Sequence, residues 1–94
     1  MSYRLVFKTD AKKEWDKLDA SIRDQFKKKL VERLNNPRIE KSRLSGMLDC
    51  YKIKLRSAGH RLVYQVRDNE VVVSVVAVGK RERNAVYKAA MKRM

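Results

Sequence analysis

The first residues of the chain place hydrophobic side chains at the spacings of one short strand and one short helix. The segment "YRLVF" (3–7) alternates loosely between apolar and polar residues, as a half-buried strand does. In the "AKKEWDKL" that follows, Ala11, Trp15 and Leu18 share one helical face. Asp10 precedes this segment and is a candidate N-cap. The pattern therefore predicts that the chain begins with a strand and a helix.

A second, longer helix is predicted after Ser21, which is another candidate N-cap. Its apolar stripe repeats every four residues and consists of Ile22, Phe26, Leu30 and Leu34. The helix should end at "NNP", because the residue before Pro37 disfavours helical geometry. Residues 38–48 then form a basic loop, in which Gly46 is expected at a turn.

Three strands are predicted in the second half of the chain, at about 50–56, 61–67 and 70–78. The segment "SAGH" links the first two, and the "DN" at 68–69 suits a tight hairpin between the last two. The third strand carries valine on both faces, so it should lie in the middle of a sheet. Asn84 or a neighbour is expected to cap a final helix that runs to Met94.

The predicted order of elements is β-α-α-β-β-β-α, and the 94 residues allow only one domain with a modest core. We therefore expect an α+β fold in a small single domain spanning residues 1–94. A mainly antiparallel sheet would pack against the two N-terminal helices, with a short C-terminal helix completing the fold.

The strands at about 50–56 and 61–67 can be aligned by their hydrophobic faces. Pairing Leu55 with Leu62, and Ile53 with Tyr64, places apolar residues opposite one another. The other face then carries Lys52, Lys54, Arg56 and Arg61. This register sets Arg56 opposite Arg61 and makes Lys54 a diagonal neighbour of Arg61. Like charges side by side on a sheet repel each other, so this face either is merely solvated or binds something strongly negative.

The composition favours the second interpretation. Lys and Arg number 24 against 11 Asp and Glu, which gives a net charge of +13 and makes nucleic acid the first candidate partner. A single cysteine, Cys50, and a single histidine, His60, exclude an internal disulfide and a zinc site, and we expect no metal or cofactor. The N-terminus does not resemble a secretory signal and "VVVSVVAV" is too short for a membrane helix, so the expected location is the cytoplasm, without membrane contact.

A face made of cations suits phosphate, which Arg binds with two hydrogen bonds and Lys as a point charge. Crowded cations also lower the pKa of a lysine, and a partly neutral lysine can accept a proton. The face could therefore bind RNA or cleave it through the ribose 2′-hydroxyl. For any one basic residue a solvated surface role is the more ordinary explanation, but four of them converge here without an interleaved carboxylate.

The other residues that could take part in catalysis have more ordinary structural explanations. The histidine pair of common ribonucleases is absent, and His60 alone is more often a structural or surface residue. Cys50 is interpreted as a packing residue, and Trp15, Phe26, Tyr51 and Tyr64 fall on apolar stripes as core residues. Tyr87 lies in the first turn of the last helix, after the basic segment "GKRER" (79–83), and could either pack inward or stack on a base.

The stretch "DCYKIKLRSAGHRLVYQV…VVVSVVAVGKRERNAVY", with "KEWDKL" and "KKKLVERLNNPRIE" before it, closely resembles the RelE toxins of the RelE/ParE superfamily. The resemblance implies ribosome-dependent mRNA cleavage in the A site. It assigns the chemistry to Lys52, Lys54, Arg61, Arg81 and Tyr87. Lys54 would be the base for the 2′-hydroxyl, and Arg81 the acid or its electrostatic substitute. Lys52 and Arg61 would hold the phosphate, and Tyr87 would stack on the mRNA base.

The resemblance also implies a protein partner and a DNA ligand, and the sequence departs from the family pattern at two positions. A cognate acidic, RelB-like antitoxin would wrap the toxin, and their complex would bind operator DNA. Further contacts to RNA or the ribosome are assigned to Arg43, Arg56, Lys80 and Arg83. His60 stands where relatives often have tyrosine, and Ser45 where they often have a basic residue that Arg43 could replace.

Two other functions fit the same sequence. A ParE-like toxin would inhibit DNA gyrase and cleave no RNA, although the full set of five residues that the resemblance assigns to the chemistry argues against it. A basic nucleic-acid-binding module without catalysis would use only the charge.

Overall fold

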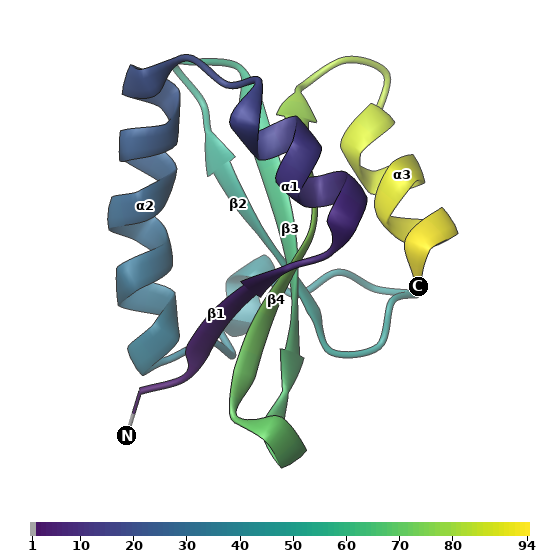
Figure 1. The fold of residues 1–94 in the computed structure, drawn as a ribbon. Coiled ribbons are helices and arrows are strands. Elements are labelled where there is room, and N and C mark those ends of the chain that lie inside the picture. The colour runs from purple at the N-terminus through teal and green to yellow at the C-terminus, as the bar shows by residue number, and fades with distance from the viewer. Residues whose placement is uncertain (1) are drawn as a thin grey trace.

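A computed structural model describes residues 2–94 and shows the predicted α+β fold (Figure 1). Its helices and strands follow the predicted order: β1 (Arg4–Phe7), α1 (Thr9–Asp16), α2 (Ala20–Asn35), β2 (Cys50–Leu55), β3 (His60–Arg67), β4 (Val72–Lys80) and α3 (Ala85–Arg93). Two short 3₁₀ turns, η1 (Glu40–Ser42) and η2 (Asp68–Glu70), lie in the connections. No helix within the described residues is long and apolar enough to span a membrane.

The four strands form one mixed sheet in the order β1-β4-β3-β2. β2, β3 and β4 are antiparallel, whereas β1 pairs with β4 in parallel. The predicted central position of the valine-rich strand is confirmed, because β4 lies between β1 and β3 and is buried on both faces.

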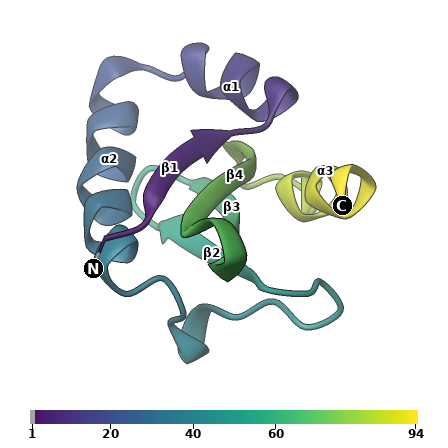
Figure 2. The same cartoon turned by 60° about the horizontal axis from the view of Figure 1, so that its bottom comes forward.

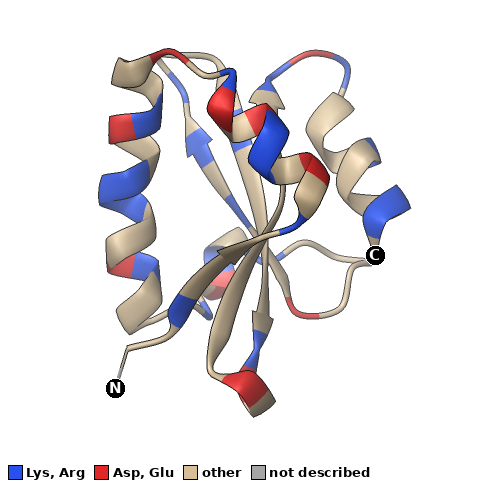
Figure 3. Ribbon diagram, in the orientation of Figure 1, with Lys and Arg blue, Asp and Glu red and all other residues tan. Residues whose placement is uncertain are grey.

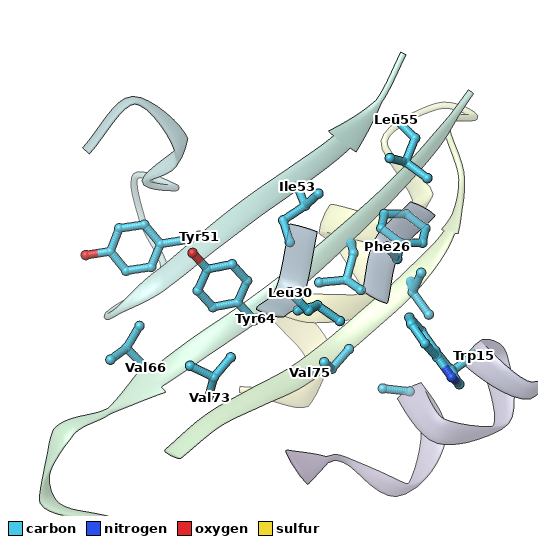
Figure 4. Packing of buried hydrophobic residues seen from close by; sticks show 13 residues of the cluster. Trp15, Phe26, Leu30, Tyr51, Ile53, Leu55, Tyr64, Val66, Val73 and Val75 are labelled. Carbon is cyan, nitrogen blue, oxygen red and sulfur yellow. The ribbon is translucent and has the colours of Figure 1, made fainter. Parts of the chain in front are cut away.

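One face of the sheet carries the main core, which α1 and α2 cover (Figure 4). Trp15 of α1 and Phe26 and Leu30 of α2 pack against this face. The four-residue repeat along α2 explains this contact, since it keeps the apolar side chains on one helical stripe. The sheet contributes Tyr51, Ile53, Leu55, Leu62, Tyr64, Val66, Val73, Val75 and Val78.

The opposite face is covered only in part, by α3 (Figure 2). Val86 and Ala90 of α3 pack against Val63, Val76 and Ala77. The β3–β4 register shifts between Val63 and Tyr64, and this bulge turns both Val76 and Ala77 towards α3. The main tertiary contacts of α3 are to β4 and β3. On β2, Cys50 is buried in the same cluster, whereas Lys52 and Lys54 remain partly exposed.

The predicted N-caps of the first two helices are wrong. Both Asp10 and Ser21 lie inside the first turn, and the residues at the cap positions make no side-chain cap hydrogen bond. The chain enters α1 directly from the sheet, because the backbone N–H of Lys8 still donates to the carbonyl of Val75 (2.9 Å). Asp19 occupies the cap position of α2, immediately after the short link from α1.

The predicted hairpin between β3 and β4 is also wrong in detail. Residues 68–70 form η2, and Val71 follows with a left-handed backbone (φ 53°). The connection is therefore longer than a two-residue Asp-Asn turn.

The register of β2 and β3 differs from the predicted one by two residues. Leu55 pairs with His60 rather than Leu62, and Lys54 lies directly opposite Arg61 rather than diagonal to it. The reason is the turn, which spans residues 56–59 and closes with Gly59 at φ +63°. Because side chains alternate with a period of two, this shift keeps every residue on its predicted face.

Glu14 and Arg93 connect α1, β4 and α3. The Glu14 carboxylate accepts the backbone N–H of Val78 (3.2 Å), beyond the point where β1 stops pairing with β4. The Arg93 guanidinium donates to both oxygens of Glu14 (2.8 and 3.0 Å) and to the carbonyl of Val76 (2.9 Å). This network satisfies the free edge of β4 and anchors the C-terminal end of α3.

We expect Glu14→Ala to lower the free energy of unfolding by about 1–3 kcal/mol, because it leaves partly buried donors without an acceptor. Asp16→Ala is the matched control on the same helix. Its ion pair with Lys12 is exposed, so its loss should cost less than about 0.5 kcal/mol. Urea unfolding of both variants measures the difference, and equal losses would contradict the role of the network.

Candidate active site

The centre of the candidate site is the pair formed by Lys54 on β2 and Arg61 on β3. The two residues are direct partners in the antiparallel ladder, which places their Cβ atoms about 5 Å apart. Lys52 lies two residues away on the same face of β2, and all three side chains are half-buried. They occupy the face that α3 covers in part, at the edge it leaves open.

Two connections bring further arginines to this end of the sheet. The backbone N–H of Arg81, just after β4, donates to the carbonyl of Gly59 in the β2–β3 turn (2.7 Å). Arg81 and the turn residue Arg56 therefore lie beside the Lys54–Arg61 pair. Figure 3 shows the basic segments of β2 and of the loop before α3 at the same end of the sheet.

The crowding of these cations lowers the pKa of Lys54, as expected from the sequence. The charge of Lys52 is the largest cause, followed by desolvation and then by Arg61, Arg56 and Arg81. Each of these charges disfavours a second positive charge nearby. Within residues 2–94, no carboxylate forms an ion pair with Lys52, Lys54, Arg61 or Arg81.

Several basic residues elsewhere in the described chain are neutralised by acids. Arg38 contacts Asp49 (3.0 Å) and Asp68 (2.8 Å), and Arg67 contacts Glu70 (2.7 Å). These residues line an open cavity of about 610 Å³ at the other end of β3. This cavity has mixed charge, unlike the cationic face around Lys54.

Arg61 has two contacts on its α3 side. Its guanidinium carbon lies 4.8 Å from the centroid of the Tyr87 ring, and its Nη1 donates to the side-chain oxygen of Asn84 (3.0 Å). A guanidinium over an aromatic face is a favourable cation–π arrangement. The ring of Tyr87 thus lies at the border of the cationic cluster.

The structure shows how Tyr87 is packed. The residue is half-buried and packs against the core cluster beneath α3. Its hydroxyl is buried and finds no hydrogen-bond partner among residues 2–94. The ring, rather than the hydroxyl, is therefore the part of Tyr87 that contacts the site.

The structure does not gather all predicted contact residues at one point. Arg56 is exposed in the β2–β3 turn, and Arg83 is exposed in the loop with Arg81. Lys80 is the last residue of β4 and pairs with His60, which directly precedes Arg61 on β3. Arg43 pairs with Tyr51 through an isolated bridge and contacts Glu40 (3.5 Å), apart from the cluster.

Cys50 and His60 have the structural environments expected of them. Cys50 is fully buried, and burial raises the pKa of its thiol to about 11, which keeps it protonated. A ring nitrogen of His60 lies 2.7 Å from the carbonyl of Ala58, within the turn. No group of three His, Cys, Asp or Glu side chains in the described residues is placed to hold a metal ion.

Asn84 is the site residue whose contact the sequence did not reveal. It was expected only as a helix cap, and it occupies the cap position without making a side-chain cap hydrogen bond. Its side chain contacts Arg61, 23 positions earlier in the chain. Asparagine tolerates the left-handed backbone found here (φ 58°), but no local pattern predicts the distant partner.

Comparison with known proteins places this geometry in a family. Residues 5–85 match the family described as the ParE toxin of the type II toxin-antitoxin system parDE. The chain is 62% identical over 94 residues to the mRNA interferase toxin RelE of Escherichia coli strain K12, covering 100% of this chain and 99% of that protein. The chain belongs to the RelE toxins of the RelE/ParE superfamily.

Solved RelE structures have the same fold. A free E. coli RelE toxin with two arginines replaced by alanine superposes with a TM-score of 0.92 at 60% identity, covering 100% of this chain and 99% of that chain. A chain of the intact E. coli RelBE toxin-antitoxin complex gives a TM-score of 0.84 at 62% identity, covering 87% of this chain and all of that one. The family and fold predicted from the sequence are thus confirmed.

We expect Lys52→Ala to raise the pKa of Lys54, because Lys52 is the largest cause of its depression. Lys28→Ala on α2 is the control, since Lys28 is exposed and is not among the charges that act on Lys54. An NMR titration of the lysine side-chain resonances measures both. An unchanged Lys54 pKa in Lys52→Ala would contradict the electrostatic description of the site.

Proposed function

We propose that this protein is the toxin of a type II toxin-antitoxin pair and cleaves mRNA codons in the ribosomal A site, without a metal or cofactor. The observation that carries the proposal is Lys54, whose pKa is lowered by a cluster of cations that no acid neutralises. The relatives named mRNA interferase RelE support the assignment of substrate and reaction. Cleavage of the message stops translation.

In the proposed reaction, the neutral amine of Lys54 takes the proton of a ribose 2′-hydroxyl. The 2′-oxygen attacks the adjacent phosphorus, and the bond from phosphorus to the 5′-oxygen breaks. Lys52 and Arg61 hold the phosphate as its negative charge grows. Arg81 acts at the leaving 5′-oxygen as the acid or its electrostatic substitute. The products are a 2′,3′-cyclic phosphate and a free 5′-hydroxyl.

The remaining residues orient the message. Tyr87 offers a ring at the border of the cluster, on which an mRNA base can stack. Arg43, Arg56, Lys80 and Arg83 are exposed and supply contacts to RNA or the ribosome. Because the cationic face is an open sheet surface, the ribosome must provide much of the alignment that brings a 2′-hydroxyl to Lys54.

An acidic, RelB-like antitoxin is the proposed partner that controls this activity in the cytoplasm. Related RelE chains have been solved with the antitoxin RelB and with a RelB peptide. A flexible acidic segment suits a surface with a net charge of +13, since it covers a large area while it folds. Operator DNA is proposed as a ligand of the toxin-antitoxin complex only.

A second candidate function is inhibition of DNA gyrase, because the matching family is described as the ParE toxin. Primer extension on translated mRNA separates the candidates. Cuts within codons on translating ribosomes support the ribonuclease, whereas gyrase-dependent DNA breaks without mRNA cuts support the ParE function. A protein that does neither would favour the third interpretation, a basic nucleic-acid-binding module without catalysis.

Lys54→Arg tests whether Lys54 is a base or only a charge. Arginine keeps the positive charge but does not give up its proton near neutral pH. We expect Lys54→Arg to lower the single-turnover cleavage rate as strongly as Lys54→Ala, by a factor of roughly 10²–10⁴. Ribosome affinity should change little, since one contact among many is altered. Near-normal cleavage by Lys54→Arg would show that only the charge of Lys54 is used.

A 2′-deoxy nucleotide at the cut position tests the nucleophile. Without the 2′-hydroxyl there is no internal nucleophile, so cleavage at that codon should stop while neighbouring sites stay sensitive. Ribosomes programmed with matched deoxy and ribose messages provide the comparison. If the deoxy message is cut at the same site, an external nucleophile attacks the phosphate and the proposed mechanism is wrong.

A further inference from the structure

The side chain of Arg61 is held by contacts with α3 as well as by its backbone position on β3. One guanidinium nitrogen, Nη1, donates to Asn84, and the guanidinium lies over the ring of Tyr87. Its Nε is buried and has no hydrogen-bond partner among residues 2–94. The other terminal nitrogen, Nη2, makes no hydrogen bond within the described chain. The arrangement fixes the plane of the guanidinium and leaves Nη2 for an anion.

The backbone explains why Asn84 can reach Arg61. Arg83 and Asn84 both have a left-handed conformation, at φ 47° and 58°, so the chain reverses sharply between β4 and α3. Asparagine tolerates this conformation better than most residues with a side chain. The turn is fixed on one side by the bond from Arg81 to Gly59 and on the other by the N–H of Lys88, which donates to the carbonyl of Asn84 (3.0 Å).

We propose that Asn84 is a positioning residue that holds the Arg61 guanidinium against Tyr87 and directs its free nitrogen towards the phosphate site beside Lys54. Asn84 itself would not touch the substrate. Its amide is neutral, so it orients Arg61 without reducing the charge available to the phosphate. The catalytic part of this inference rests on the proposed ribonuclease function, but the contact between Asn84 and Arg61 does not.

Asn84→Gly is the variant that isolates the side chain. Glycine adopts the left-handed backbone without strain, whereas alanine would add a backbone penalty of its own. Val71→Gly is the matched control, because Val71 has the same left-handed backbone (φ 53°) and precedes the other end of β4. Both variants can be compared by their amide NMR spectra before they are assayed.

The first readout needs no ribosome. A guanidinium over an aromatic ring has its side-chain protons shifted upfield by the ring current. We expect Asn84→Gly to reduce this shift for Arg61, and Asn84→Asp, which keeps an acceptor in a residue that tolerates the left-handed backbone, to retain it. Val71→Gly should leave it unchanged. An unchanged Arg61 shift in Asn84→Gly would overturn the proposal.

The second readout separates positioning from binding. On programmed ribosomes, Asn84→Gly should lower the single-turnover rate at saturation about tenfold, because the phosphate-binding group is misplaced. The affinity and its salt dependence should not change, since no charge has been removed. A loss of affinity with an unchanged saturated rate would overturn the positioning role.

A double variant tests whether Asn84 acts through Arg61. In an Arg61→Ala background, Asn84→Gly should have no further effect on the rate, because the group it positions is gone. Two independent, multiplying losses would show that Asn84 acts by another route. If the unaltered protein cleaves no message on ribosomes, the proposed function fails, and the ring-current experiment still decides whether Asn84 holds Arg61.

Discussion

The pairing of Lys54 with Arg61 across β2 and β3 is the constraint on which the site depends. Two cations directly opposite on a sheet destabilise the strand pair. The same strands carry Ile53, Leu55, Leu62 and Tyr64 on their other face, in the main core. Burial of that face excludes a slip by one residue, which would exchange the core for the charges, and the β2–β3 turn selects between the alignments that remain. The hydrophobic core therefore holds the like charges together. The charge of Lys52 is the largest cause of the lowered pKa of Lys54, followed by desolvation and then by Arg61, Arg56 and Arg81.

The second half of the site comes from a segment that is distant in sequence. Arg81, Asn84 and Tyr87 reach the Lys54–Arg61 pair because the loop after β4 is attached to the β2–β3 turn and α3 covers β3 and β4. The Glu14–Arg93 network holds the far end of α3. The site thus combines charged residues on the adjacent strands β2 and β3 with the N-terminal end of α3, which orients Arg61.

The sequence predicted the elements that depend on periodicity. The two-residue alternation of β2 and β3 was sufficient to place Lys52, Lys54 and Arg61 on one face, and the valines identified β4 as the central strand. It did not predict the register, because the alternation is unchanged by a two-residue shift and the turn length decides between the two alignments. Arg81 was assigned by resemblance alone, and the contact between Asn84 and Arg61 depends on how α3 packs, which no local pattern encodes.

The pH dependence of cleavage tests the central claim most directly, namely that the crowded cations make Lys54 a base. With toxin below saturation, the rate constant reports the protonation state of the free protein. The account predicts that the rate rises with pH and levels off at the lowered pKa of Lys54, below the ordinary lysine value. In Lys52→Ala the levelling-off should move to higher pH, because the largest cause of the lowered pKa is gone. A rate that does not change as Lys54 titrates, or a profile that Lys52→Ala leaves in place, would contradict the account.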